Sequence, residues 1–216
     1  MKTILLIRHG ENDSLGKFLP GHLPGIHLND AGKVQAKLVA ESLKDIPIKT
    51  ILSSPLERAV ETASPLAEAL GLEIKIEPGF IEMNTGEWTG MKFPDLKGNP
   101  TWEKLRKDPV NNTFPSGEGF REAQERLWTA LQVVVETIGD NDCCVVFSHS
   151  DCIKLILARA MEMPISRYYS FTVDTASLSV LNFRKDRIYL DGQNLRLPYQ
   201  WQPRRLPKPD TENKKD

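Results

Sequence analysis

The chain has 216 residues, 40% of them hydrophobic, and its 28 Lys and Arg residues almost balance 29 Asp and Glu residues. This length suits one globular unit with a sizeable core, and the balanced charge argues against binding to nucleic acid or to an anionic membrane. Any attraction for an anion must therefore come from a local cluster. We predict one domain over residues 1–202 with a cap or insertion at about residues 83–116, and a disordered tail over residues 203–216.

The sequence also predicts a cytoplasmic protein. No stretch approaches the roughly 20 apolar residues of a membrane helix, and the apolar run at residues 3–7 is too short for the core of a signal peptide. Three cysteines, none in a Cys-x-x-Cys pair, suit reduced and buried thiols.

Three short apolar runs predict strands that are buried on both faces, and each stops at polar residues. They cover residues 3–7, 50–52 and 143–147. Residues 177–183 and 187–190, joined by residues 184–186, predict a hairpin at or near an edge of the sheet.

Helical patterns follow these runs. The first helix is expected to be capped by Asn29 or Asp30, with Val34, Leu38 and Leu43 on one face. The second is expected to begin at Ser54-Pro55, to bury Ala59, Thr62, Ala63, Leu66 and Leu70, and to end at Gly71.

Two further helices are predicted in the second half of the chain. A long one opens at Ser116 or Gly117 and closes at Gly139, with an apolar face that includes Leu127 and Leu131. Residues 151–161 are apolar nearly all round and predict a buried helix. Strands that alternate with helices favour an α/β fold, a three-layer sandwich with a mostly parallel central sheet flanked by helices.

Charged residues follow the carboxyl ends of the predicted strands. In open α/β sheets, loops and helix N-termini converge at that edge, and ligands bind there. Arg8 and His9 follow the first strand, Arg58 follows the second, and His149 follows the third buried run. Guanidinium groups match phosphate oxygens bidentately, and imidazoles add further donors. The cluster therefore predicts a phosphate site that needs no metal and no cofactor.

His9 is the candidate nucleophile. Nearby arginines disfavour its imidazolium form, which leaves a neutral nitrogen free to attack phosphorus. The other ring nitrogen should donate to a backbone carbonyl, and Gly10 allows the tight turn that this requires.

Five ordered motifs resemble the histidine phosphatase superfamily, also called the phosphoglycerate mutase-like family, over residues 3 to about 184. Five motifs at compatible spacings are far more specific than an isolated Arg-His-Gly. They are Arg8-His9-Gly10-Glu11, Ser53-Ser54-Pro55-x-x-Arg58-Ala59-x-Glu61-Thr62, Glu82-x-x-x-Gly86-x-Trp88-x-Gly90, Pro115-x-Gly117-Glu118 and Ser148-His149-Ser150-Asp151.

The resemblance implies a role for each catalytic residue. His9 becomes phosphohistidine, Arg8 and Arg58 hold the phosphoryl oxygens, and His149 donates to the oxygen that gains charge. Glu82 is the implied acid and base, although Glu11, Glu87 and Glu118 are other carboxylates that could reach a site. Glu118 is expected instead to orient a neighbour or to cap the long helix.

The phosphate contacts of the first loop are less well defined. Asn12 and Gly21 are candidate phosphate-binding residues. Many family members carry Asn where Leu15 stands, and Leu15 has no donor. Either Asn12 replaces that amide or the loop over residues 15–27 is rearranged.

The favoured function is hydrolysis of phosphate monoesters of small metabolites. A phosphoglycerate mutase is the alternative. The resemblance implies that mutases of this family carry a longer basic insertion with adjacent arginines and a C-terminal segment that closes over the site. Here the segment after Trp88 is short and has no Arg-Arg pair, which favours hydrolysis, but Arg204-Arg205 in the tail keeps the mutase reading open. A metallohydrolase and a non-catalytic phospho-ligand-binding protein are less favoured, since no His-x-His or His-x-x-x-His spacing occurs and all the pocket residues are retained. A homodimer is left open.

Overall fold

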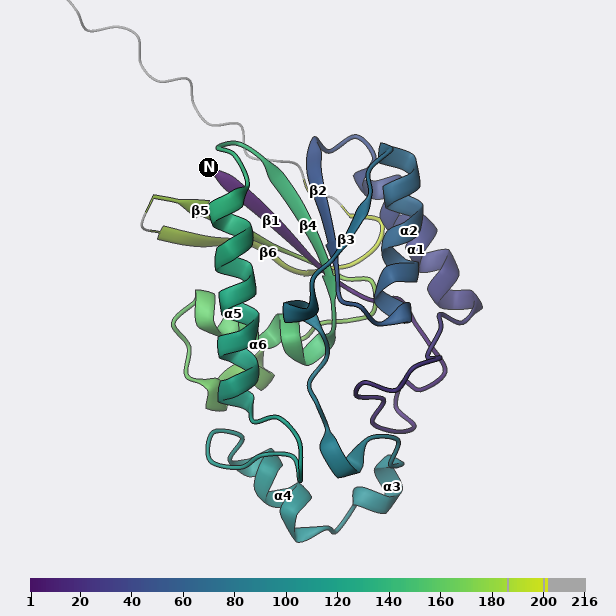
Figure 1. Cartoon of the computed structure of the whole chain (residues 1–216), viewed down its shortest axis with the longest axis vertical. Helices are drawn as coiled ribbons and strands as arrows, with labels where there is room; N and C mark the ends of the chain where they lie inside the picture. The colour runs from purple at the N-terminus through teal and green to yellow at the C-terminus, as the bar shows by residue number, and fades with distance from the viewer. Residues whose placement is uncertain (186, 200, 202–216) are drawn as a thin grey trace, which may run out of the picture.

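The protein is built around a six-stranded sheet, as seen in a computed structural model that describes residues 1–185, 187–199 and 201 (Figure 1). The strand order is β3-β2-β4-β1-β5-β6. The strands are β1 (Lys2–Arg8), β2 (Ile48–Ser53), β3 (Ile74–Ile76), β4 (Cys143–Ser148), β5 (Leu178–Arg184) and β6 (Arg187–Leu195).

The sheet is mostly parallel, as predicted. β1 and β2 both pair parallel with β4, and β3 pairs parallel with β2, whereas β5 and β6 add an antiparallel hairpin at one edge. Arg8 lies beside Ser148 on the neighbouring strand, and Ser53 lies beside Phe147 on the other side of β4. The carboxyl ends of three adjacent strands are therefore level with one another.

Helices cover both faces of the sheet (Figure 1). Helices α1 (Asp30–Leu43) and α2 (Glu57–Leu70) pack against one face together with Leu5 and Ile7 of β1. Helices α5 (Phe120–Thr137) and α6 (Ser150–Ala160) pack against the other face together with Ile4 and Leu6. Because alternate side chains of a strand point to opposite faces, a continuous apolar run serves both layers. The predicted three-layer sandwich is confirmed.

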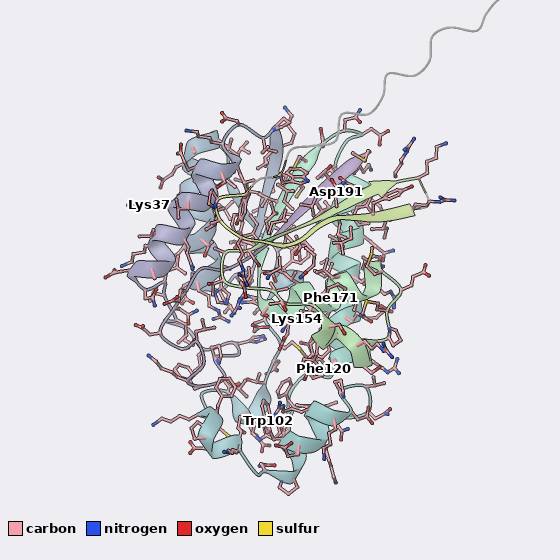
Figure 2. All side chains as sticks on the ribbon, turned by 180° about the vertical axis from the view of Figure 1, so that it is seen from behind. Lys37, Trp102, Phe120, Lys154, Phe171 and Asp191 are labelled. Atoms are coloured by element: carbon pink, nitrogen blue, oxygen red, sulfur yellow. The ribbon has the colours of Figure 1, made fainter. Side chains whose placement is uncertain are left out.

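The segment over residues 83–116 lies beyond the carboxyl ends of the parallel strands and contains short helices (Figure 1). These are η2 (Gly86–Trp88), α3 (Phe93–Leu96) and α4 (Pro100–Lys107). Trp88 is buried and packs edge-on against Trp102 and Phe114, with ring centroids 5.6 and 5.9 Å apart. Figure 2 places Trp102 in this part of the molecule, away from the sheet. The aromatic residues therefore hold the segment together.

The predicted apolar face of α1 was wrong at two positions. Val34 is 57% exposed and Leu38 is 42% exposed, whereas Leu43 is buried as expected. The buried face is made mainly of small residues, and at Gly32 it lies against the backbone of Glu11. It comprises Gly32, Ala36, Val39, Ala40 and Leu43.

The predicted start of α2 was also wrong. The helix begins at Glu57, and its N-terminal neighbour Leu56 makes no side-chain cap. The hydroxyl of Ser54 accepts from the backbone N–H of Leu56 at 3.4 Å, one residue before the helix, and also lies 2.8 Å from Nε2 of His149. The helix ends at Gly71, as predicted.

The later elements agree with the sequence in type, but their limits differ. The long helix starts at Phe120 rather than at Ser116 or Gly117, because Ser116 has a left-handed backbone with φ of 52°. Its last residue is Thr137, so it ends two residues before Gly139. The final strand extends to Leu195.

Several short elements gave no sequence signal. These are β3, α3, α4, η1 (Pro78–Phe80), η2 and η3 (Ile165–Ser170). Within the described ranges, no helix combines the length and apolar character needed to cross a membrane. The predicted tail over residues 203–216 lies outside the described residues, as does Asp186 of the predicted hairpin connection.

The contact between α1 and the turn after β1 requires glycine. A Cβ atom on Gly32 would lie 2.0 Å from the carbonyl oxygen of Glu11, and one on Gly10 would lie 2.9 Å from the carbonyl oxygen of Gly32. Two backbones thus approach each other where side chains do not fit. The turn that carries His9 is held against α1 by this approach.

We predict that Gly32→Ala lowers the free energy of unfolding by about 1–3 kcal/mol, because the methyl group forces the turn and α1 apart. Urea denaturation measures this change. Lys33→Ala, an exposed change on the same helix, serves as the control. A Gly32→Ala protein as stable as the control would contradict the close approach.

Candidate active site

His9 lies at the carboxyl end of β1 and is 5% exposed. Its Nδ1 atom is 2.8 Å from the carbonyl oxygen of Gly10. Because a carbonyl only accepts, Nδ1 carries the proton and the neutral ring has its lone pair on Nε2. The backbone thus selects the tautomer whose Nε2 can act as a nucleophile.

The surroundings of His9 keep its ring neutral. Burial lowers the pKa of His9 well below its usual value, and the positive charges of Arg8 and Arg58 lower it further. Loss of hydration and nearby like charges both disfavour the imidazolium form. The ring is therefore an unprotonated base at neutral pH.

The two arginines are held by backbone carbonyls and leave other donors unused. Nη1 of Arg8 donates to the carbonyl oxygen of Val173 at 2.8 Å, and Nη2 of Arg58 donates to that of Gly21 at 3.1 Å. Nε of Arg8 and both Nε and Nη1 of Arg58 are buried without a hydrogen-bond partner. Arg58 is fully buried.

His149 completes the cluster from the N-terminal end of α6. Its Nε2 atom is 2.8 Å from Oγ of Ser54, and its ring centroid is 5.3 Å from that of His9. Burial and the charge of Arg58 lower the pKa of His149 well below its usual value, so the ring is neutral. Oγ of Ser54 accepts from the backbone N–H of Leu56 at 3.4 Å and can donate its own proton to Nε2, which leaves the ring proton on Nδ1. Nδ1 is buried and has no hydrogen-bond partner.

The unpartnered donors all belong to this one cluster. In the part of the chain that the structure describes, four buried side-chain nitrogen or oxygen atoms lack a partner, and all four are nitrogens of Arg8, Arg58 and His149. A buried donor without an acceptor costs about 1–3 kcal/mol. Several unpartnered donors that lie together can bind an anion with several acceptor oxygens. The N-terminal amides of α6 add positive potential at the same place.

Glu82 adds a carboxyl group to the edge of the cluster. Its Oε1 atom accepts from the backbone N–H of Met83 at 3.0 Å and lies 3.5 Å from Sγ of Cys152, while Oε2 is 3.7 Å from Nδ1 of His149. The side chain is 17% exposed. Burial raises the pKa of Glu82, and the negative charge of Asp151 raises it further. The environment therefore favours a protonated carboxyl group more than water does.

The other carboxylates considered from the sequence have different partners. Glu11 accepts from the side chain of Asn29, Glu87 accepts from the hydroxyl of Ser116, and Glu118 forms an ion pair with Arg126. Glu82 is the carboxylate that lies beside His149.

Asn12 and Gly21 lie near the cluster, in positions that differ from each other. Oδ1 of Asn12 accepts from the backbone and hydroxyl of Ser14, and its Nδ2 atom is 3.5 Å from Nδ1 of His9, the nitrogen that already faces Gly10. Gly21 is buried and directs its carbonyl oxygen to Arg58. Leu15 is 44% exposed. A direct phosphate contact of Asn12 or Gly21 stays a prediction.

Three contacts of the site were not anticipated from the sequence. Ser54 fixes the ring of His149, Cys152 lies against Glu82, and Nε2 of His22 donates to the carbonyl oxygen of Glu82 at 2.6 Å. No local pattern announces these roles, because each depends on how separate segments meet. Ser54 was noted in a motif, but as a helix cap.

The donor set does not resemble a metal centre. Among the described residues, no group of three or more His, Cys, Asp and Glu side chains is placed to hold a metal ion. His27 instead forms an ion pair with Glu61, and all three cysteines are buried free thiols. Two guanidinium groups beside the histidines would also repel a cation.

Comparisons with known proteins agree with this geometry. The profile of the histidine phosphatase superfamily (branch 1) matches residues 4–196. The chain is 30% identical to phosphoserine phosphatase 1 of Hydrogenobacter thermophilus, covering 87% of this chain and 89% of that protein. It is 28% identical to a 2,3-bisphosphoglycerate-dependent phosphoglycerate mutase of Thermoplasma acidophilum, covering 89% and 92%.

A solved structure shares both the fold and part of the sequence. The alpha-ribazole phosphatase from Shigella flexneri superposes with a TM-score of 0.81 at 27% identity, covering 89% of this chain and 96% of that one. The match of the profile to most of the chain, together with relatives that include phosphatases and a mutase, establishes the family. The chain belongs to the histidine phosphatase superfamily, branch 1.

Proposed function

We propose that this protein hydrolyses phosphate monoesters of small metabolites through a phosphohistidine formed on His9. The observation that carries the proposal is the set of four buried, unpartnered nitrogens on Arg8, Arg58 and His149. A phosphoryl group has the charge and the number of acceptor oxygens to satisfy them. The tautomer of His9, with Nδ1 on a carbonyl, leaves the nucleophilic nitrogen free.

In the first step, Nε2 of His9 attacks phosphorus and the bond between phosphorus and the ester oxygen breaks. Arg8, Arg58 and His149 donate to the phosphoryl oxygens, whose charge is redistributed in the transition state. Glu82 gives its proton to the departing alkoxide, which leaves as an alcohol. The raised pKa of Glu82 favours the protonated form that this step needs.

In the second step, Glu82 is a carboxylate and takes a proton from water. The resulting hydroxide attacks phosphorus, the bond between phosphorus and Nε2 breaks, and inorganic phosphate leaves. Glu82 is then protonated again, and His9 is again neutral. One carboxyl group thus serves both half-reactions, because the proton that it gives in the first returns in the second.

We propose that the segment over residues 83–116 is the cap of this site. Hydrolysis is favoured over transfer to a second hydroxyl because this segment is short and lacks the Arg-Arg pair expected of a mutase. Relatives at similar identity include both a phosphatase and a mutase. Arg204-Arg205, which kept the mutase alternative open, lie outside the described residues. A panel of phosphorylated metabolites, scored for free phosphate and for isomerised product, separates the two reactions. Free phosphate without isomer supports the phosphatase.

We expect His9→Ala to reduce turnover by on the order of 10³-fold or more, because no other group can form the phosphoenzyme. Two measurements follow the effect: turnover of an aryl phosphate, and recovery of protein that carries the labelled phosphoryl group of the substrate after an alkaline quench. His27→Ala, which removes an exposed histidine that pairs with Glu61, is the matched control. Labelled protein in the His9 variant would contradict the assignment.

Glu82→Gln should separate substrates whose leaving group needs a proton from substrates whose leaving group does not. Turnover of an alkyl phosphate should fall by about 10²–10⁴-fold, since an alkoxide leaves poorly without an acid. A nitrophenyl phosphate should still form phosphohistidine near the wild-type rate, because its leaving group needs no proton. Rapid-quench kinetics follow the first turnover. Equal losses with both substrates would show that Glu82 is not the acid.

The pH profile should reflect two shifted groups. With an alkyl phosphate, kcat/KM should fall at low pH as His9 is protonated, and at high pH as Glu82 loses its proton. Asp151 raises the pKa of Glu82, so Asp151→Asn should move the alkaline limb to lower pH and leave the acid limb in place. Because the pH profiles of the wild-type protein and of Asp151→Asn are measured with the same substrate, titration of the substrate affects both equally. An alkaline limb that moves to higher pH would contradict this role of Asp151.

A further inference from the structure

The segment that carries Glu82 has no strand pairing, and β4 contacts it through the hydroxyl of Ser148, which donates to the carbonyl oxygen of Phe80 at 2.8 Å. Glu82 lies between η1 (Pro78–Phe80) and η2 (Gly86–Trp88), in a stretch without strand or helix. A side chain on such a stretch has no hydrogen-bond ladder to fix its backbone. Its position relative to His149 therefore depends on side-chain contacts, which include donation from Nε2 of His22 to the carbonyl oxygen of Glu82 and from Sγ of Cys152 to that of Ile81. These two contacts come from the first loop and from α6.

Arg126 of α5 supplies a further contact, which engages two carbonyl oxygens before Glu82. Its Nη1 atom donates to the carbonyl oxygens of Gly79 and Ile81 at 2.8 and 3.1 Å. Its Nε and Nη2 atoms donate to the two carboxylate oxygens of Glu118, both at 2.8 Å. Every guanidinium nitrogen is thus engaged, and one of them holds the residue directly before Glu82.

Glu118 extends the same contact to the other side of Glu82. The backbone N–H of Glu118 donates to the carbonyl oxygen of Asn84 at 2.8 Å, and Oε2 of Glu118 accepts from the backbone N–H of Asn84 at 3.4 Å. The Glu118–Arg126 pair therefore contacts backbone both before and after Glu82. The sequence suggested that Glu118 orients a neighbour, and the structure identifies Arg126 as that neighbour.

The pair is sufficiently buried to act as a fixed support. The side chain of Glu118 is 9% exposed and that of Arg126 is 25% exposed. An exposed ion pair contributes little, because water and salt compete with it. A bidentate pair with restricted access to water has a defined geometry, so the backbone that it holds is defined as well.

We propose that Arg126 and Glu118 are positioning residues for the acid–base group, acting through the backbone on either side of Glu82 and not on the phosphate. The inference rests on the proposed role of Glu82. Because proton transfer needs close hydrogen-bond geometry, a small displacement of the carboxyl group slows it strongly, while the phosphate pocket on β1, α2 and α6 is unaffected.

The test uses Arg126→Met, which keeps an unbranched apolar stem but removes all five donors. With an alkyl phosphate, kcat should fall by about 10²-fold with little change in KM. The rate at which His9 is phosphorylated by a nitrophenyl phosphate should stay close to that of the wild type, because this step needs no acid. Arg126→Lys, which can still donate to one or both carbonyls, should recover part of kcat.

Two controls distinguish positioning from a general loss of structure. Glu125→Gln removes a partner of the exposed pair between Glu125 of α5 and Arg159 of α6, which does not contact the segment of Glu82, and should leave kcat unchanged. Glu118→Gln combined with Arg126→Met should lose no more activity than Arg126→Met alone, because both residues act as one support. Thermal unfolding of each variant sets an assay temperature at which it is folded.

The outcomes distinguish the positioning role of Arg126 and Glu118 from the proposed function. Selective loss with the alkyl phosphate supports the positioning role. Unchanged kcat in Arg126→Met, or equal losses in turnover and in phosphorylation of His9, would overturn it. Absence of labelled His9 in the wild-type protein would instead overturn the proposed function, whatever the variants do.

Discussion

The guanidinium groups of Arg8 and Arg58 and the imidazoles of His9 and His149 lie together inside the protein, with four of their nitrogens unpartnered. Burial of so many donors is unfavourable unless an acceptor arrives, because each lost hydrogen bond to water has to be replaced. The level carboxyl ends of β1, β2 and β4 bring Arg8, Arg58 and His149 to one edge of the sheet. The remaining features of the site depend on this concentration of positive potential at a buried position.

The same environment sets the protonation state of each group in the proposed mechanism. Burial and positive neighbours keep both histidines neutral, with His9 ready to attack through Nε2 and His149 ready to donate through Nδ1. Burial acts on Glu82 in the opposite sense, since the charged form of a carboxyl group is the anion, and raises its pKa. One physical cause thus prepares a nucleophile, a donor and an acid.

Much of this arrangement could be predicted from the sequence, for identifiable reasons. Continuous apolar runs fix the buried strands, and the residue that follows each run must lie at the sheet edge, which is why Arg8, His9 and His149 were found. The face of α1 was misjudged because small residues, not Val34 and Leu38, make the close contact. The supports of the site, including Ser54 and Arg126, could not be predicted, because their contacts join segments distant in the chain and have no periodic signal.

A crystal structure of the protein with vanadate tests the central claim most directly, because vanadate adopts the geometry of a phosphoryl group in transfer. We predict vanadium bonded to Nε2 of His9, with its oxygens within hydrogen-bond distance of Nε of Arg8, of Nε or Nη1 of Arg58, and of Nδ1 of His149. Vanadate bound elsewhere, or bound with those four nitrogens still unpartnered, would contradict the account.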